Sequence, residues 1–393
     1  MSYNQPTSPF LDMGFRPFFL GAAVFATLSM LLWAGVYLFG LAVPITNITM
    51  YEWHAHEMFF GYALAVIAGF LLTSVRTWTR LPTAHGLILL LLFLLWAVAR
   101  VLWMFGTSYI EYAAIFDITF ALCLSALLAL RIVQAKQWEQ LGIIAILLLI
   151  TAANIIFFLG AFGFVKQGVT WGIYSALYLV IALIMTMGRR VIPFFIERAA
   201  GSDVLLKNNK WLDILNIVGF LAFAINEIFV GRDDVSAYLA LSLFVINSIR
   251  LLGWFHPIIF KQSLLWSLYF AFWMITLGFL LLAMPYFAEQ IFSAASIYLA
   301  IHAFTVGGIA VITLGMMARV SLGHTGNNVY QPPRLLKVSL AAIAISAFVR
   351  VLIPYFEIWP YYLLIGLSQL LWVIAFILFI FTYGPLLCRA KQH

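Results

Sequence analysis

The sequence predicts an all-α polytopic membrane protein with about twelve transmembrane helices and both termini in the cytoplasm. Three observations support this prediction: 65% of the residues are hydrophobic, only 9% are charged, and the apolar residues form long continuous runs. A soluble domain has roughly a quarter charged and about half apolar residues. Because each spanning helix needs about 20 residues, the chain of 393 residues has no room for a large aqueous domain. We therefore expect its function to lie within the helices or in short loops.

Twelve apolar runs, bounded by charge, proline or glycine, are long enough to span a bilayer. They lie at about 17–40, 53–75, 85–104, 111–133, 141–162, 170–188, 211–230, 236–255, 264–284, 294–317, 337–356 and 360–387. The chain is thus predicted as one helical domain over 1–393, with a short cytoplasmic segment over 1–16 and its longest cytoplasmic loop over 189–210. No cleavable leader is evident, so we expect the first span to direct insertion. No internal sequence repeat is evident either.

Basic residues flank the predicted helices unequally. With twelve spans, 17 of the 21 lysines and arginines flank one face, and Arg100, Lys166, Arg232 and Arg350 flank the other. The positive-inside rule places the richer face in the cytoplasm. The net charge of +7 is therefore read as a topological signal, and we expect the lipid bilayer, not nucleic acid, as the partner.

Missing motifs exclude several classes of chemistry. With only two cysteines, Cys123 and Cys388, and no C-x-x-C-H motif, any haem would be held non-covalently. No P-loop, G-x-G-x-x-G, H-E-x-x-H or serine elbow occurs, so ATP use, dinucleotide binding and hydrolysis lack support. Metal binding, haem binding and transport remain.

The densest polar cluster lies at the start of the second predicted helix, where His54, His56 and Glu57 fall within four positions. Ionisable side chains within a membrane are costly and mark functional sites by default, which favours metal or haem ligation here. On a regular helix, His54 shares a face with Glu57, whereas His56 points elsewhere. The two histidines therefore need an irregular first turn or separate partners.

A stripe of small residues follows this cluster along the same helix, at Gly61, Ala65, Ala68 and Gly69. One interpretation is close packing against a neighbouring helix, which small residues permit. The other is a wall against which a flat macrocycle lies, with a histidine at its edge.

The second histidine pair, His302 and His324, belongs to the tenth predicted helix and its end. A continuous helix between them rises about 33 Å, a full hydrocarbon thickness, so the two cannot share one metal. We expect two sites near opposite surfaces, or one outer site and another role for His324 beside Arg319. Interhelical hydrogen bonding is the alternative for His302. Met316 and Met317 are weak candidate ligands for Cu(I), although methionine in apolar helices usually serves packing.

Other polar residues within the predicted spans carry weaker signals. Asp117 and Asn154 could line a route for water or protons, or they could form interhelical hydrogen bonds. Arg16 begins the first helix, where it sets topology or pairs with a haem propionate. His85, His256 and His393 fall in loops or at interfaces and are assigned no role.

Three motifs resemble the NnrS family of bacterial inner-membrane proteins. They are Gly14-Phe-Arg16-Pro17-Phe-Phe, Trp53-His54-Ala-His56-Glu57-Met58 with Gly61-Tyr-Ala and Ala68-Gly69-Phe-Leu-Leu-Thr73, and His302-Ala-Phe-Thr305-Val-Gly through Gly315-Met-Met317-Ala-Arg319-Val-Ser-Leu-Gly323-His324-Thr-Gly326. The resemblance extends from end to end of the chain.

This resemblance implies a twelve-helix protein that handles nitric oxide, in denitrification or in resistance to nitrosative stress. It implies haem, which we expect to be haem b, and copper as cofactors. It carries ligand candidacy to His54, His56, His302 and His324. Independently of the resemblance, Glu57, Arg16 and Arg319 are accessory candidates because they lie beside these histidines or at a helix end. It does not assign haem or copper to individual residues.

The sequence departs from the family pattern at Tyr269, where we expect a histidine, and at Asn327, where we expect an arginine. Tyrosine ligates haem iron in catalase, so Tyr269 is a further accessory candidate.

Two functions compete at this point. The first is a membrane oxidoreductase that binds nitric oxide at haem and detoxifies it, with a quinol as a suitable electron donor. The second is a transporter or trafficking factor for copper, haem or a small solute, in which Gly307-Gly308 would break a helix at mid-membrane.

Overall fold

The computed structural model describes residues 8–201, 204–206, 208–288 and 296–390, and every regular element in these ranges is a helix. The predicted all-α fold is therefore confirmed. Within the described residues, twelve helical spans are long and apolar enough to cross a membrane, as predicted. The cytoplasmic placement of the termini stays a prediction.

The chain divides into two compact units, which we describe separately. Unit 1 comprises Met1–Leu179, Met317–Leu336 and Phe376–His393, and unit 2 comprises Val180–Met316 and Lys337–Ala375. The apolar pattern of the sequence predicts a single helical domain and gives no sign of this division. Four helices, whose bounds follow below, contain residues of both units, so the boundaries between the units fall inside helices.

The helices that lie wholly in unit 1 are α1 (Phe15–Phe39), α2 (Met50–His56), α3 (Leu64–Thr79), α4 (Gly86–Met104), α5 (Ile110–Gln134) and α6 (Leu141–Ala161). Those wholly in unit 2 are α8 (Lys210–Ile225), α9 (Asp233–Gly253), α10 (Ile258–Lys261), α11 (Ser263–Phe287) and α12 (Ser296–His302). The four helices with residues of both units are α7 (Gly168–Ala200), α13 (Val311–Thr325), α14 (Arg334–Val351) and α15 (Tyr361–Cys388). Short 3-10 turns occupy Pro9–Leu11, Thr107–Tyr109, Trp138–Gln140 and Ile353–Phe356.

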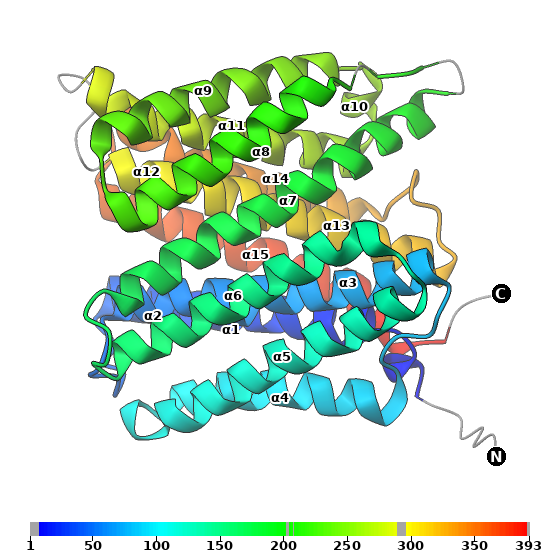
Figure 1. The fold of residues 1–393 in the computed structure, drawn as a ribbon, viewed down its shortest axis with the longest axis horizontal. Coiled ribbons are helices and arrows are strands. Elements are labelled where there is room, and N and C mark those ends of the chain that lie inside the picture. The colour runs from blue at the N-terminus through cyan, green and yellow to red at the C-terminus, as the bar shows by residue number, and fades with distance from the viewer. Residues whose placement is uncertain (1–7, 202–203, 207, 289–295, 391–393) are drawn as a thin grey trace. The chain divides into compact units, whose positions relative to one another are not determined.

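Consecutive helices pack side by side within each unit, as short connections require. In unit 1, α4 and α5 form a hairpin, and α5 also packs against α6 (Figure 1). In unit 2, α8 and α9 form a second hairpin, and α9 packs along α11. These neighbours bury the apolar faces that the sequence assigns to the spans.

The predicted loop over 189–210 is largely helical. Helix α7 continues through Arg189, Arg190 and Pro193 as far as Ala200, and α8 begins at Lys210. The expected end at residue 188 rested on charge and proline as helix breakers. That rule fails here because a proline inside a helix can be accommodated by a kink.

Two spans contain a π-helical segment that directly follows a histidine. Helix α2 ends at His56, and the π-helical segment Glu57–Ala63 connects it to α3. Helix α12 ends at His302, and the π-helical segment Ala303–Ala310 connects it to α13. We call Met50–Thr79 the His56 span and Ser296–Thr325 the His302 span. The wider i→i+5 turns are rare and occur frequently at functional sites.

The two spans carry the same residues at the positions that shape them. Four identical pairs, each separated by 246 residues, are His56 and His302, Gly61 and Gly307, Gly69 and Gly315, and Thr79 and Thr325. Each threonine hydroxyl donates to the carbonyl four residues earlier, and a left-handed residue follows it, Arg80 (φ 58°) or Gly326 (φ 84°). Four identities in 30 positions are too few to mark a repeat in the sequence alone.

Each span also packs through its glycines on the helix that precedes it in the chain. A Cβ atom at Gly69 would lie 2.8 Å from the Phe19 ring of α1, and one at Gly315 would lie 2.9 Å from Ser267 Oγ of α11. The structure therefore reveals a repeated helix pair, α1 with the His56 span and α11 with the His302 span.

Candidate functional site

His56 lies at the centre of a buried polar cluster in unit 1. The helix that carries it begins with a capping box, in which Thr49 and Glu52 satisfy each other's backbone N–H groups. His56 is fully buried, and the side chain of Glu57 is 1% exposed. The first turn of this span is thus fixed, and it places two ionisable side chains in the interior.

Both ring nitrogens of His56 have polar partners. Nδ1 lies 2.9 Å from Oε1 of Glu57, and Nε2 lies 3.0 Å from Oδ1 of Asn154 on α6. The second carboxylate oxygen of Asp117, on α5, lies 3.9 Å from Nε2. The ring therefore connects the His56 span to two further helices.

Arg100, on α4, joins the two carboxylates of the cluster. Its Nη1 donates to Glu57 Oε1 and its Nη2 donates to Asp117 Oδ1, and the side chain is 5% exposed. A Cβ atom at Gly61 would lie 2.9 Å from Arg100 Nη1, so this position needs glycine. We call His56, Glu57, Arg100, Asp117 and Asn154 the His56 cluster.

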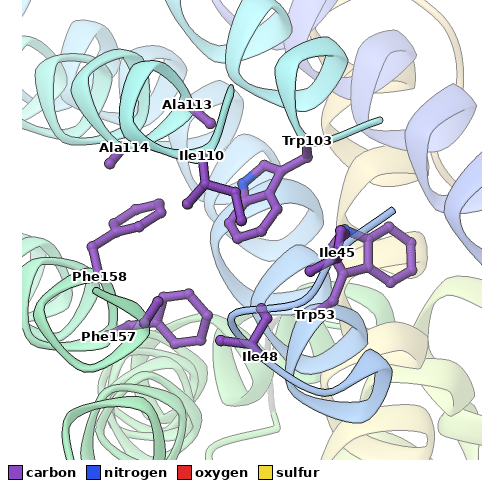
Figure 2. Packing of buried hydrophobic residues seen from close by; sticks show 10 residues of the cluster. Ile45, Ile48, Trp53, Trp103, Ile110, Ala113, Ala114, Phe157 and Phe158 are labelled. Atoms are coloured by element: carbon purple, nitrogen blue, oxygen red, sulfur yellow. The ribbon is translucent and has the colours of Figure 1, made fainter. Parts of the chain in front are cut away.

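An apolar aromatic shell surrounds this cluster. The His56 ring lies 4.3 Å from the ring of Phe157, 5.0 Å from Trp103 and 5.2 Å from Phe158, measured between centroids. Figure 2 shows these three side chains converging with Trp53, Ile48 and Ile110 in one hydrophobic cluster. The ionic groups are therefore shielded from water.

The burial of these charged groups affects the stability of unit 1. Removing an ion from water costs several kcal/mol even after relaxation, and partners must offset that cost. In the His56 cluster, the Arg100 guanidinium donates to the carboxylates of Glu57 and Asp117 at the same time. The cluster therefore holds four helical segments in one arrangement, and the loss of any charged member would leave another uncompensated.

Sequence analysis found only part of this cluster. It placed Glu57 on the helix face of His54, whereas in the structure Glu57 Oε1 lies 2.9 Å from Nδ1 of His56. It read Arg100 as a topological charge and Asp117 and Asn154 as weak signals. A signal for the cluster was available in the sequence. Only 9% of the residues are charged, yet adjacent spans contain an arginine and an aspartate, and each of these needs a partner in the membrane.

His54 has different surroundings from His56. Its ring stacks on Trp33 of α1, with centroids 4.7 Å apart and an interplanar angle of 8°. The contacts described for the two histidines therefore involve different helices, α1 for His54 and α6 for His56.

His302 belongs to unit 2 and ends α12. Its Nδ1 donates to the backbone carbonyl of Tyr298 at 2.6 Å. This bond places a proton on Nδ1, and such a bond orients the ring in many metal-ligating histidines. Tyr269, also in unit 2, donates its hydroxyl to the Leu251 carbonyl at 2.8 Å. Its hydroxyl thereby ties α11 to α9.

The remaining predicted residues lie in helices. His324 is in the last turn of α13, with its ring 5.8 Å from that of Phe15. Arg16 is buried and donates to the carbonyls of Leu387 and Arg389, so it caps the end of α15. Arg319 and Met317 are buried in α13, and Met316 precedes them there.

The small-residue stripe serves helix packing. A Cβ at Gly61 would lie 2.6 Å from the Phe25 ring, and one at Gly69 would lie 2.8 Å from the Phe19 ring and 3.0 Å from Phe18 Cβ. Side chains of α1 therefore occupy the face that the macrocycle interpretation needs. The packing interpretation is the one the structure supports.

The donors present fit haem unequally. His56 has both ring nitrogens engaged and an aromatic shell against its faces, so it does not fit an axial ligand. His302 donates one ring N–H to a backbone carbonyl, as metal-ligating histidines commonly do. Within the described ranges, no group of three or more His, Cys, Asp and Glu side chains is placed to hold a metal ion.

Comparison with known proteins covers almost the whole chain. A family model described as NnrS protein matches residues 9–391. No curated protein matches the chain. The match includes both histidine motifs and every helical span described above. The chain therefore belongs to the NnrS family.

Proposed function

We propose that this chain is a haem-binding membrane protein of the bacterial inner membrane that binds and detoxifies nitric oxide, with reduction as the chemistry. The observation that carries the proposal is the family match over residues 9–391, which suggests a role in nitric-oxide-related metabolism. Twelve apolar spans suit a substrate gas that partitions into lipid.

His302 is the proposed axial ligand of the haem. Its Nδ1–H donates to the Tyr298 carbonyl, and a bond of this kind orients the ring in many metal-ligating histidines. A haem held by this residue would supply the iron at which nitric oxide binds. His54 and His324 are also proposed as ligands. Neither belongs to the His56 cluster of unit 1.

A reductive route needs electrons and protons in addition to haem. A membrane quinol carries both and suits a chain with no aqueous redox domain, so we propose it as the donor class. Copper is a proposed second metal, with Met316 and Met317 as its weakest candidate ligands.

The helix that would support the transport alternative is continuous. Gly307 and Gly308 lie inside the π-helical segment Ala303–Ala310, and the span runs on to Thr325. We therefore retain transport only as an outcome of the test.

Absorption spectra of the detergent-purified protein, oxidised and dithionite-reduced, with and without nitric oxide, test the proposal when iron and copper are measured on the same sample. We expect a b-type spectrum, near-stoichiometric iron and a shift on adding nitric oxide. A colourless, iron-free protein from haem-replete cells would overturn the proposal and favour transport.

A pair of variants tests the ligand assignment. His302→Ala should lose most of its haem or change the iron coordination, because the proposed donor atom is gone. His85→Ala is the matched control, since His85 Nδ1 also bonds a carbonyl, that of Thr83 at 2.9 Å, outside the proposed site. Equal haem content in both variants would remove His302 from the site.

A further inference from the structure

The repeat of the His56 span and the His302 span continues into the helix that follows each of them. Helix α4 carries Ala97-Val-Ala-Arg100-Val-Leu102, and Ala347-Phe-Val-Arg350-Val-Leu352 lies at the end of α14. The alanine, arginine, valine and leucine that end or begin these motifs are identical, and each pair is separated by 250 residues. Arg100 of unit 1 and Arg350 of unit 2 are therefore equivalent residues.

The two arginines differ in their partners. Arg100 donates to the carboxylates of Glu57 and Asp117. Arg350 is also buried, at 9% exposed, but its Nη1 donates to the hydroxyl oxygen of Tyr361 at 2.8 Å, and its Cζ lies 5.3 Å from the centroid of that ring. Within the described residues, no ion pair joins Arg350 to a carboxylate.

The sequence explains this difference in counter-charge. Ala303 follows His302, at the position that Glu57 occupies after His56, and helices α11 to α15 contain no acidic residue. Beyond α10 the chain has only two acidic residues, Glu289 and Glu357. Glu289 falls outside the described residues, and Glu357 is exposed. The carboxylates that neutralise Arg100 thus have no counterpart in the second set of helices.

A buried guanidinium without a counter-charge is costly. An ion taken out of water needs an opposite charge and acceptors for its hydrogen-bond donors. A guanidinium has five N–H groups, and Tyr361 accepts from one nitrogen. The negative end of the α14 dipole offsets only a small part of the charge. The remaining donors of Arg350 fit an oxyanion, which arginine binds through two parallel N–H groups.

The surroundings of Arg350 indicate the class of this anion. Arg350 is the second-last residue of α14, and Trp359 and Tyr362, which follow in the chain, are exposed. Tryptophan and tyrosine are enriched at the level of lipid headgroups, and arginine near a helix end reaches the same level. We infer that Arg350 and Tyr361 form a binding site in unit 2 for the oxyanion of an amphipathic ligand. The source of that oxyanion is a lipid phosphate or a haem propionate, and only the second source rests on the proposed function.

Native mass spectrometry of the full chain, delipidated in detergent, tests the lipid source. Phosphatidylglycerol is added to wild type, to Arg350→Gln and to Arg232→Gln, and a neutral diacyl glycolipid serves as the phosphate-free probe. Arg232 is the matched control because it is exposed and pairs with Asp234. We expect the first phosphatidylglycerol to bind about ten-fold more weakly to Arg350→Gln than to the control, and the glycolipid to bind both equally.

The haem source predicts a different result. Removing a cation beside a propionate favours ferric haem, so Arg350→Gln should lower the haem reduction potential and leave lipid binding equal to that of Arg232→Gln. Arg350→Lys keeps the charge and should restore most of whichever property is lost. An Arg350→Gln variant that matches Arg232→Gln in both lipid binding and haem potential would overturn the inference. In a protein without haem, lipid binding alone decides it, so its failure is distinct from that of the proposed function.

A further variant tests whether the chain supplies the counter-charge itself. Glu289→Gln combined with Glu357→Gln removes both acidic residues beyond α10. We expect the unfolding midpoint and the binding of phosphatidylglycerol to stay at the wild-type values. A midpoint lowered as much as in Arg350→Gln would mean that a carboxylate of the chain balances Arg350, and the inference would be wrong.

Discussion

The His56 span and the His302 span share the same order of helical segments, but their histidines have different hydrogen-bond partners. Each has a histidine at the end of an α-helix, a π-helical segment after it, glycines five and thirteen positions on, and a terminal threonine. In the first span the histidine bonds a carboxylate and an amide in a fully buried cluster. In the second, the histidine Nδ1 donates to the backbone carbonyl of Tyr298.

This difference shows that the shared order of helical segments places a histidine at the same position in each span but does not determine the partners of that histidine. The role depends on side chains from other helices and on the residue that follows. Arg100, Asp117 and Asn154 approach the His56 cluster from α4, α5 and α6, and together with Glu57 they form its polar surroundings. Equivalent histidines of the two spans therefore have different hydrogen-bond partners.

The largest effect on stability should come from breaking the His56 cluster at Arg100. We expect Arg100→Met to destabilise the protein by about 3–5 kcal/mol, because it removes the guanidinium that bonds both buried carboxylates. Unfolding midpoints in detergent measure the change.

The matched control is Arg232→Met, which breaks an exposed ion pair with Asp234. Exposed pairs contribute little, so we expect no measurable shift. Equal midpoints for the two arginine variants would mean that the cluster does not stabilise unit 1.

An intermediate effect should separate equivalent glycines of the two spans. We expect Gly69→Ala to cost about 1–3 kcal/mol, because its Cβ would meet Phe19 and the fixed Cβ of Phe18. Gly315→Ala should be near neutral, because its Cβ meets only the rotatable hydroxyl of Ser267 below 3.4 Å and alanine favours the helix. Thermal unfolding of both variants compares them. A larger loss at Gly315 would contradict the packing described for α11.

The smallest effect concerns Tyr269, where the family resemblance leads us to expect a histidine. Tyr269→Phe should cost about 0.5–1.5 kcal/mol, because it removes the hydrogen bond to the Leu251 carbonyl. It should leave haem content unchanged. Tyr383→Phe is the control, since the buried Tyr383 hydroxyl has no hydrogen-bond partner among the described residues. Loss of haem in the Tyr269 variant alone would instead make this tyrosine a ligand.

Much of the fold follows from the sequence. Long apolar runs predict the twelve spans, and the predicted bounds of α1 and α4 differ from the observed ones by one or two residues. The end of α7 was missed because Pro193 reads as a breaker. The π-helical segments were missed as well, since an i→i+5 turn has no apolar period that distinguishes it over seven or eight residues.

The candidate site was predictable only in part. The motif histidines His56 and His302 stand out in the sequence because ionisable residues are rare in these spans. Their partners do not, because Arg100 and Asp117 come from other helices. The positive-inside count explains Arg100 as one of the few basic residues on the outer face. The sequence therefore gives no reason to look for its role in the buried cluster.

The sequence by itself determined the fold class, the number of spans and the family, because hydrophobic run length and long motifs are local properties of the chain. Only the tertiary structure decided which polar residues meet: Glu57 with His56, Arg100 with two carboxylates, and α1 phenylalanines with the glycine stripe. The physical reason is that a charge buried in a membrane must be neutralised by whichever helices pack around it. Packing between helices distant in sequence is not a local property.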